Sequence, residues 1–167
     1  NDPFRKFKQK LIPTHRGYLT AKELERLEEL AINSRRLNTV RDLFVFSCYT
    51  GISYTDIMLL TKESMVLGMD TYWIVTKRQK NGNPVKIPLL KKVLDLIKRY
   101  MTDKRSLVNN TLFPRISNQK MNAYLKEIAP LAGMPHPALY FLFLLFYFSF
   151  YSFASVDHLN HSVRTLF

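Results

Sequence analysis

A short β-type stretch between two long runs of helical periodicity is the feature that most constrains the fold. Residues 71–75 are rich in β-branched and aromatic side chains, and residues 85–89 alternate apolar side chains with others, as expected of a second strand. Between them lies Asn81-Gly82, a pair that readily supplies the two positive φ angles of a tight hairpin turn. The sequence therefore predicts an antiparallel β-hairpin in an otherwise helical body.

Helical patterns flank the hairpin on both sides. Thr20 and Glu23 have the spacing of a capping box, which predicts a helix over residues 21–33. The other predicted helices cover residues 38–50, a short segment opened by Ser53 and Asp56, residues 90–101 and residues 117–131. The expected fold class is mainly α with a small antiparallel hairpin or sheet.

Positive charge is concentrated in one part of the chain. The 25 Lys and Arg residues exceed the 13 Asp and Glu residues, for a net charge of +12. After Glu127 the only charged residues are Asp157 and Arg164, so the whole surplus lies in residues 1–127. Such a surplus attracts polyanions, since each phosphate that a Lys or Arg neutralises releases condensed counterions. Nucleic acid is the leading partner, and a solvated basic surface that binds nothing specific is the alternative.

The two ends of the chain differ from its middle. Residues 1–17 are basic and punctuated by proline, which predicts a linker from an upstream core-binding module, followed by a domain over residues 18–133. Residues 134–167 form an aromatic-rich segment, in which residues 137–156 carry no charge and are long enough to span a bilayer. A membrane-tethered basic protein spanning at 137–156 is therefore the alternative, less favoured function.

Cys48 is the only cysteine, and it lies in an apolar run. It cannot form an internal disulfide or a thiolate metal site by itself, and a reducing cytosol suits it. No stretch at the N-terminus has the pattern of a secretory signal. We expect a cytoplasmic protein.

Two segments carry a resemblance to a known family. Residues 50–57 (TGISYTDI) resemble the Thr-Gly-Leu-Arg-x-Ser-Glu segment of tyrosine recombinases, the phage integrase family, and follow a predicted helix as that segment does. Ser53 then occupies the place of the first catalytic arginine, which some Bacteroides or conjugative-transposon-type integrases also lack. Lys80, in the hairpin that leads to Ile87-Pro88-Leu89, resembles the catalytic lysine that the family carries on its β2–β3 turn.

The resemblance continues through Leu112-Phe113-Pro114 and the helix from Ser117, and then fails after Gly133. The family requires His-x-x-Arg-His there, and this motif is missing. His161 instead fits the third-motif histidine, because residues 159–165 (LNHSVRT) resemble Leu-Gly-His-Ser-x-x-Arg-Thr. The nucleophilic tyrosine should follow His161, and the sequence ends at Phe167 before that place. We therefore expect a tyrosine-recombinase catalytic-domain fold that is incomplete at its C-terminus.

The resemblance implies a function in DNA integration and recombination by phosphotyrosyl strand exchange, without metal or other cofactor. Lys80 would deliver a proton to the leaving oxygen as general acid. Phosphate contacts are expected from two basic clusters, Lys77, Arg78 and Lys86 on the hairpin and Arg5, Lys6, Lys8 and Lys10 in the linker.

We expect a DNA-binding domain that no longer cleaves, so whether the chain is an enzyme stays open. The changed C-terminal segment can result from a frame shift in the gene, or the chain can be a natural DNA-binding regulator, and the sequence does not choose between these origins. The family further implies a nucleoid-associated bacterial protein that can form a homo-oligomer on DNA.

Overall fold

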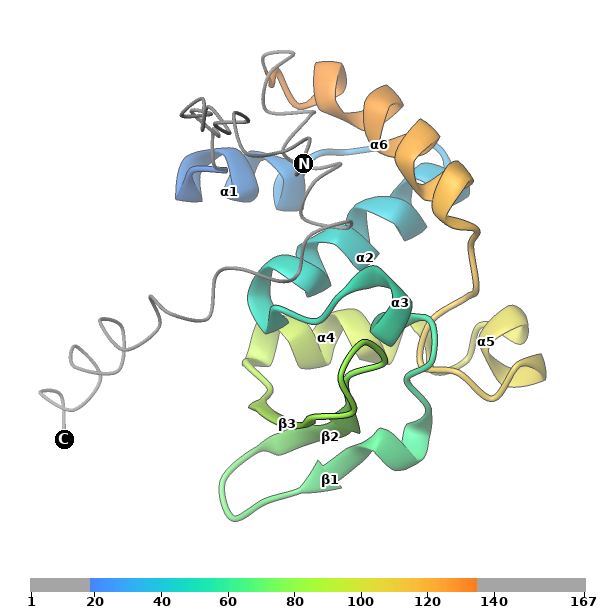
Figure 1. Cartoon of the computed structure of the whole chain (residues 1–167). Coiled ribbons are helices and arrows are strands. Elements are labelled where there is room, and N and C mark those ends of the chain that lie inside the picture. Colours follow the sequence, from blue (N-terminus) through green and yellow to red (C-terminus); the bar gives the residue numbers. More distant parts are fainter. Residues whose placement is uncertain (1–18, 135–167) are drawn as a thin grey trace, which may run out of the picture.

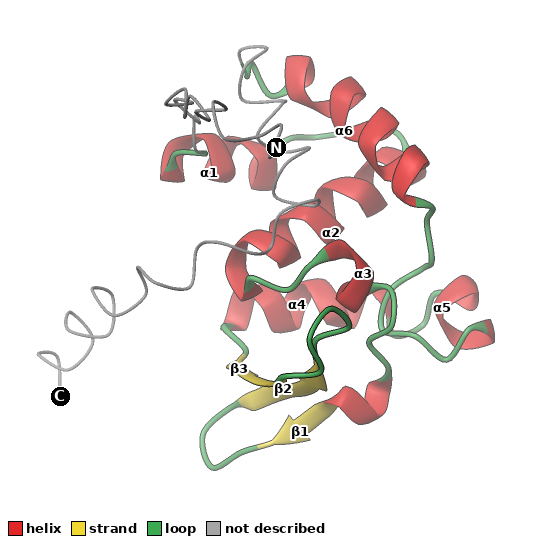
Figure 2. Cartoon of the chain, viewed as in Figure 1, coloured by secondary structure: helices red, strands yellow, loops and turns green. Residues whose placement is uncertain are grey.

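The computed structural model describes residues 19–134 of the chain (Figure 1). The elements run in the order α1 (Ala21–Glu29), α2 (Arg35–Thr50), α3 (Tyr54–Ile57), the 3-10 turn η1 (Lys62–Ser64), β1 (Met65–Leu67), β2 (Tyr72–Lys77), β3 (Pro84–Pro88), α4 (Lys91–Tyr100), α5 (Lys104–Val108) and α6 (Asn118–Leu131). Helices make up most of this part of the chain, and the small sheet lies at one end (Figure 2). The expected fold class, mainly α with a small antiparallel sheet, is confirmed.

Several predictions about the chain ends concern residues outside the described part. They are the linker over residues 1–17, the aromatic segment after Met134 and the spanning segment over residues 137–156. Among the helices of residues 19–134, none is both long enough and apolar enough to cross a membrane. The division of the chain at residues 17 and 133 stays a prediction.

The capping box predicted at the start of α1 is present. The Thr20 amide donates to the Glu23 carboxylate at 2.8 Å, and the Glu23 amide donates back to the Thr20 hydroxyl at 3.3 Å. The bond from the Thr20 amide is the main reason that the pKa of Glu23 lies below its ordinary value. This cap fixes where the first helix begins.

Helix α1 ends at Glu29 and α2 begins at Arg35, whereas the sequence predicts a first helix to residue 33 and a second from residue 38. Side chains of α2 explain the break between them. The Arg41 guanidinium donates to the Leu30 carbonyl at 2.6 Å, and the Asn38 amide group donates to the Ile32 carbonyl at 2.8 Å. These carbonyls are satisfied without further helical turns, so the chain can leave the helix early.

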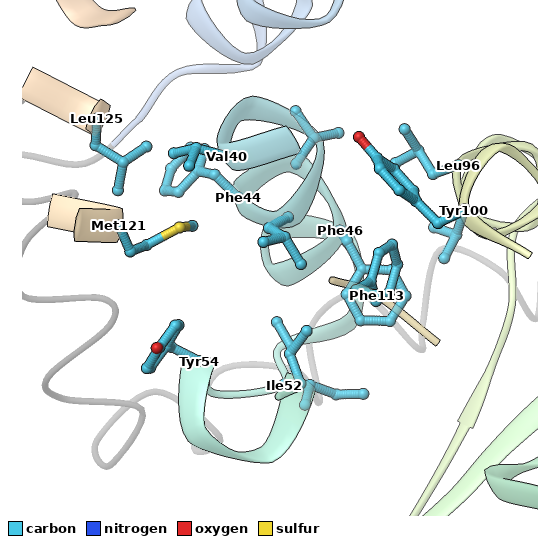
Figure 3. Close-up of a cluster of buried hydrophobic side chains, with 14 of the residues drawn as sticks. Val40, Phe44, Phe46, Ile52, Tyr54, Leu96, Tyr100, Phe113, Met121 and Leu125 are labelled. Carbon is cyan, nitrogen blue, oxygen red and sulfur yellow. The ribbon is translucent and has the colours of Figure 1, made fainter. Parts of the chain in front are cut away.

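Helix α2 forms the centre of the core. It packs against α1, α3, α4 and α6, and most of its residues are buried. Figure 3 shows Phe46 of α2 beside Phe113, whose ring lies edge-on at 4.8 Å between centroids. Tyr100 of α4 contacts the same Phe113 ring at 5.5 Å. This aromatic cluster joins the helices to the segment that follows α5, and such contacts add to the stability that burial provides.

A buried carboxylate also ties α2 to α4. Asp42 accepts hydrogen bonds from the Tyr100 hydroxyl at 2.9 Å and from the Arg41 guanidinium at 2.8 Å, and Arg99 lies 3.6 Å from it. Burial, and after it the nearby Asp42 carboxylate, raises the pKa of Tyr100 well above its ordinary value. The phenol therefore stays protonated and can keep donating to Asp42.

The sheet has the order β1-β2-β3, and both pairs are antiparallel. In the β2–β3 pair Trp73 faces Pro88 and Lys77 faces Pro84. Ile74 is fully buried, so its face of the sheet is the one turned to the core. Strand β1 was not predicted, because three residues are too few to show an alternating pattern.

The connection between β2 and β3 is not the tight turn that Asn81-Gly82 predicted. Strand pairing stops at Lys77 and Pro84, which leaves residues 78–83 as a loop in place of a two-residue turn. Within this loop only Gly82 has a positive φ, of 69°, so Asn81 does not take the conformation that the tight turn needs. The Arg78 amide donates to the Asn83 carbonyl at 2.9 Å, and the Gly82 amide donates to the Arg78 carbonyl at 2.8 Å. The loop is closed by its own backbone.

Candidate nucleic-acid interface

The β2–β3 loop is attached to α3 through one carboxylate. The Gln79 amide donates to Oδ1 of Asp56 at 3.0 Å, and the Ser53 hydroxyl donates to Oδ2 of the same residue at 2.7 Å. Asp56 is buried, and Figure 1 shows the loop reaching from the sheet to α3. Ser53 and the residue before Lys80 therefore share a single acceptor, although they are far apart in the sequence.

Ser53 lies at the N-cap of α3 and is half-buried. Its hydroxyl accepts from the Asp56 amide at 3.3 Å and lies 3.1 Å from the Thr55 hydroxyl. A serine suits this position because its side-chain oxygen satisfies an amide of the first helical turn. The position that the resemblance matches to the first arginine thus holds a neutral side chain that caps a helix.

A pocket of about 730 Å³ lies between α3, the β2–β3 loop and the segment before α6. Its lining has an apolar part and a polar part, and no Asp or Glu belongs to it. The apolar part consists of Tyr54, Met58, Leu59 and Ile116, and the polar part of Thr55, Gln79, Lys80, Arg115 and Ser117. Lys80, predicted as the catalytic lysine, is exposed and lines this pocket next to α3.

The segment before α6, which lines the other side of the pocket, is also bound to α3. The Tyr54 hydroxyl donates to the Ile116 carbonyl, and the Ile116 amide donates to the Met58 sulfur at 3.5 Å. Ser117 then caps α6 by accepting from the Lys120 amide at 3.3 Å. The first turn of α6 contains no acidic residue, so the positive end of this helix is not neutralised by its own side chains.

The hairpin carries the three cations that were predicted to contact phosphates. Lys77 and Lys86 are exposed and Arg78 is half-buried, and none of the three forms a salt bridge with any residue in 19–134. The Lys86 ammonium lies 5.0 Å from the centre of the Trp73 ring on the outer face of the sheet.

Many cations on the helices, in contrast, form salt bridges with carboxylates. The pairs are Arg35 and Arg105 with Asp103, Arg36 with Glu127, Arg41 and Arg99 with Asp42, Lys92 with Glu28, and Lys98 with Asp95. All of these lie on α1, α2, α4, α5 and α6 or in the turn before α5. The positive charge of the hairpin is therefore less neutralised than that of the helices.

Two site residues were missed from the sequence alone. Asp56 was assigned only to the start of a short helix, and its role as the acceptor for the loop depends on a contact between distant segments. Arg115 was not singled out, although its place directly after Leu112-Phe113-Pro114 was a usable signal. The predicted residues His161, Arg5, Lys6, Lys8 and Lys10 lie outside the described part of the chain.

Groups that could hold a metal ion are not found in the described part. Within residues 19–134, no three His, Cys, Asp or Glu side chains cluster as metal ligands would. Burial raises the pKa of the Cys48 thiol to about 12, so this side chain is neutral at physiological pH.

We predict that Asp56→Ala loosens the β2–β3 loop. The Gln79 amide loses its acceptor, so its exchange with solvent deuterium should accelerate at least about tenfold, equivalent to about 1.4 kcal/mol. Asp95→Ala is the matched control, because Asp95 forms only a 3.5 Å pair with the exposed Lys98. Equal exchange of the Gln79 amide in the Asp56 variant and in the unchanged protein would show that Asp56 does not hold the loop.

Comparisons with known proteins give two similarities. Residues 17–138 match the model of the phage integrase family. The fold resembles a crystal structure of the XerH site-specific recombinase bound to difH substrate in a pre-cleavage complex, with a TM-score of 0.54 and 18% identity over 71% of this chain and 37% of that chain. A post-cleavage complex of XerH with palindromic difH substrate gives a TM-score of 0.55 and 19% identity over 75% of this chain and 38% of that chain.

The chain thus spans under two fifths of the length of these recombinase chains, and at such identity the likeness concerns the fold. A search of curated proteins finds no match.

Proposed function

Since the chain belongs to the phage integrase family, we propose that it is the DNA-binding part of a site-specific recombinase. It binds duplex DNA with the surface around the β2–β3 loop. The observation that carries this proposal is the distribution of charge. Lys77, Arg78 and Lys86 have no carboxylate partner in the described part, and the adjoining pocket is lined by Lys80 and Arg115 without any acidic residue.

Such a surface suits the DNA backbone for a physical reason. Exposed cations that are not already neutralised can each replace a counterion condensed on a phosphate, and this release drives binding at low salt. Contacts of this kind fix position and affinity but read no bases. We therefore propose phosphate contacts for the hairpin cations, and also for Arg5, Lys6, Lys8 and Lys10 of the predicted linker.

Within the pocket we assign Lys80 the role of the catalytic lysine, which would protonate the leaving oxygen during strand cleavage. Its support is the shared anchor of the β2–β3 loop and Ser53 on Asp56. His161 would be the third-motif histidine. Strand cleavage also needs positive groups around the phosphorane, and Ser53 supplies none at its place. The sequence has no His-x-x-Arg-His motif either. For this polypeptide of 167 residues we propose binding without cleavage.

A nicked suicide substrate tests this proposal. We expect the chain to shift the nicked duplex in a native gel and to leave no protein–DNA band in a denaturing gel, because the charge that stabilises the transition state is incomplete. The native gel serves as the control that DNA is bound. A covalent band would contradict the loss of cleavage, and no shift at low salt would contradict DNA binding itself.

The partner and the cellular place follow from the same proposal. A recombinase domain acts on double-stranded DNA, so we place the protein in the bacterial cytoplasm, associated with the nucleoid, where it could form a homo-oligomer on its site. The serine at position 53 favours an integrase of the Bacteroides or conjugative-transposon type. Cross-linking on and off a DNA duplex would measure the assembly.

A further inference from the structure

Arg115 is an exposed cation at the edge of the pocket to which the sequence resemblance assigns no role. It lies on the wall formed by the segment before α6, whereas Lys80 lies on the wall formed by the β2–β3 loop. Within residues 19–134 Arg115 forms no salt bridge, in contrast to the arginines of α2. Its charge is therefore available to an anion that enters the pocket.

The backbone around Arg115 is firmly placed. Pro114 before it is buried, and Ile116 after it is bound through its carbonyl to Tyr54 and through its amide to Met58. Both partners belong to α3 or its C-cap, the same element to which Asp56 attaches the β2–β3 loop. The two cation-bearing walls are thus positioned by one short helix, and less entropy is lost when both contact one ligand.

The surroundings favour an anion over other ligands. No carboxylate lines the pocket, and the capped start of α6 adds the positive end of a 14-residue helix at Ser117. Lys120 in the first turn of α6 is exposed and also forms no salt bridge with a described residue. A guanidinium presents a planar fork of donors that matches two phosphate oxygens at once.

We propose that Arg115 binds a phosphate of the DNA backbone, so that the duplex is held from both walls of the pocket. This inference rests on the proposed DNA-binding function and adds a contact outside the hairpin. The hairpin alone would contact the duplex from one side, whereas Arg115 adds a phosphate contact from the opposite side of the pocket. Arg115 acts here as a binding residue.

The test measures binding of the full chain to a labelled random-sequence DNA duplex of about 20 base pairs, two helical turns, over a series of salt concentrations. Arg115→Gln should lower the slope of log K against log salt by about one and weaken binding by about fivefold to tenfold at low salt. Arg115→Lys keeps the charge, so its slope should stay at the value of the unchanged chain.

Arg26→Gln is the matched control. Arg26 is an exposed arginine on α1 that also forms no salt bridge within the described residues, and it belongs to another part of the surface. An Arg115→Gln slope equal to that of the unchanged chain, or an equal fall for both glutamine variants, would overturn the inference while leaving the proposed function intact. Failure of the unchanged chain to bind the duplex would overturn both. Circular dichroism of each variant checks that the fold is kept.

Discussion

Replacing Lys77, Arg78 and Lys86 together with glutamine should lower the slope of log K against log salt for duplex DNA by about three, since each phosphate contact contributes about 0.9. At low salt the affinity should fall about 100-fold, if each contact is worth on the order of 1 kcal/mol. The reason is that these cations have no carboxylate partner within the described residues, so their charge is available to phosphates. Fluorescence anisotropy over a salt series measures both quantities.

A control must remove the same net charge from another part of the surface. Lys22, Lys98 and Lys104 are exposed lysines on α1, α4 and α5, and their joint replacement with glutamine changes the net charge equally. We expect only a small change in the slope for this control. If the two triple variants lose affinity equally, the chain attracts DNA through its overall field, and the hairpin is not the contact face.

Phe113→Ala should lower the free energy of unfolding by about 3–5 kcal/mol, as expected when a fully buried phenylalanine is removed. Phe113 is 0% exposed and lies between Phe46 of α2 and Tyr100 of α4. Its loss leaves a cavity where the helices meet the segment that leads to Arg115. Urea denaturation followed by circular dichroism measures the change.

Leu107→Ala provides the reference for this prediction. Leu107 lies on α5 and is 49% exposed, so its truncation should change the free energy of unfolding by only about 0.5 kcal/mol. Phe113→Leu keeps most of the apolar volume and should fall between the two. A loss below about 1 kcal/mol for Phe113→Ala would mean that packing of the Phe113 ring contributes little to the stability of the core.

Elements with a local signal were predictable from the sequence. The capping box of Thr20 and Glu23 predicts the start of α1. The apolar periodicity of α4 predicts its bounds to within one residue at each end. The early end of α1 was not predictable, because it depends on Arg41 and Asn38, which reach back from the next helix. The apolar pattern of α1 continues through residues 30–33, so the sequence gives no sign that the helix ends at Glu29.

The hairpin illustrates the same limit. Asn81-Gly82 favours a two-residue turn in isolation, and the observed six-residue loop is bound to Asp56 on α3 instead. A two-residue turn at Asn81-Gly82 would extend the strands past Gln79, which instead lies in a loop that contacts Asp56. The contact between segments decides the loop length, and local turn preference does not.

The candidate site was predictable only through family resemblance. Ser53 and Lys80 were named because motifs marked their places, and the structure brings the segments that carry them together. Arg115 directly follows Leu112-Phe113-Pro114, but the resemblance assigns it no role. Its relation to the pocket comes from the bonds that Tyr54 and Met58 make to Ile116, and no sequence pattern encodes those.

Helix α3 has only four residues, and a helix of that length cannot persist in water by itself. It is stabilised by the burial of Tyr54 and Ile57, by the contact of Asp56 with the loop, and by the bonds of Tyr54 and Met58 to Ile116. Local opening of this single turn would break both attachments at once, and it would also expose the buried side chains of Tyr54 and Ile57. A phosphate bound at either wall should therefore favour the closed turn and, with it, binding at the other wall.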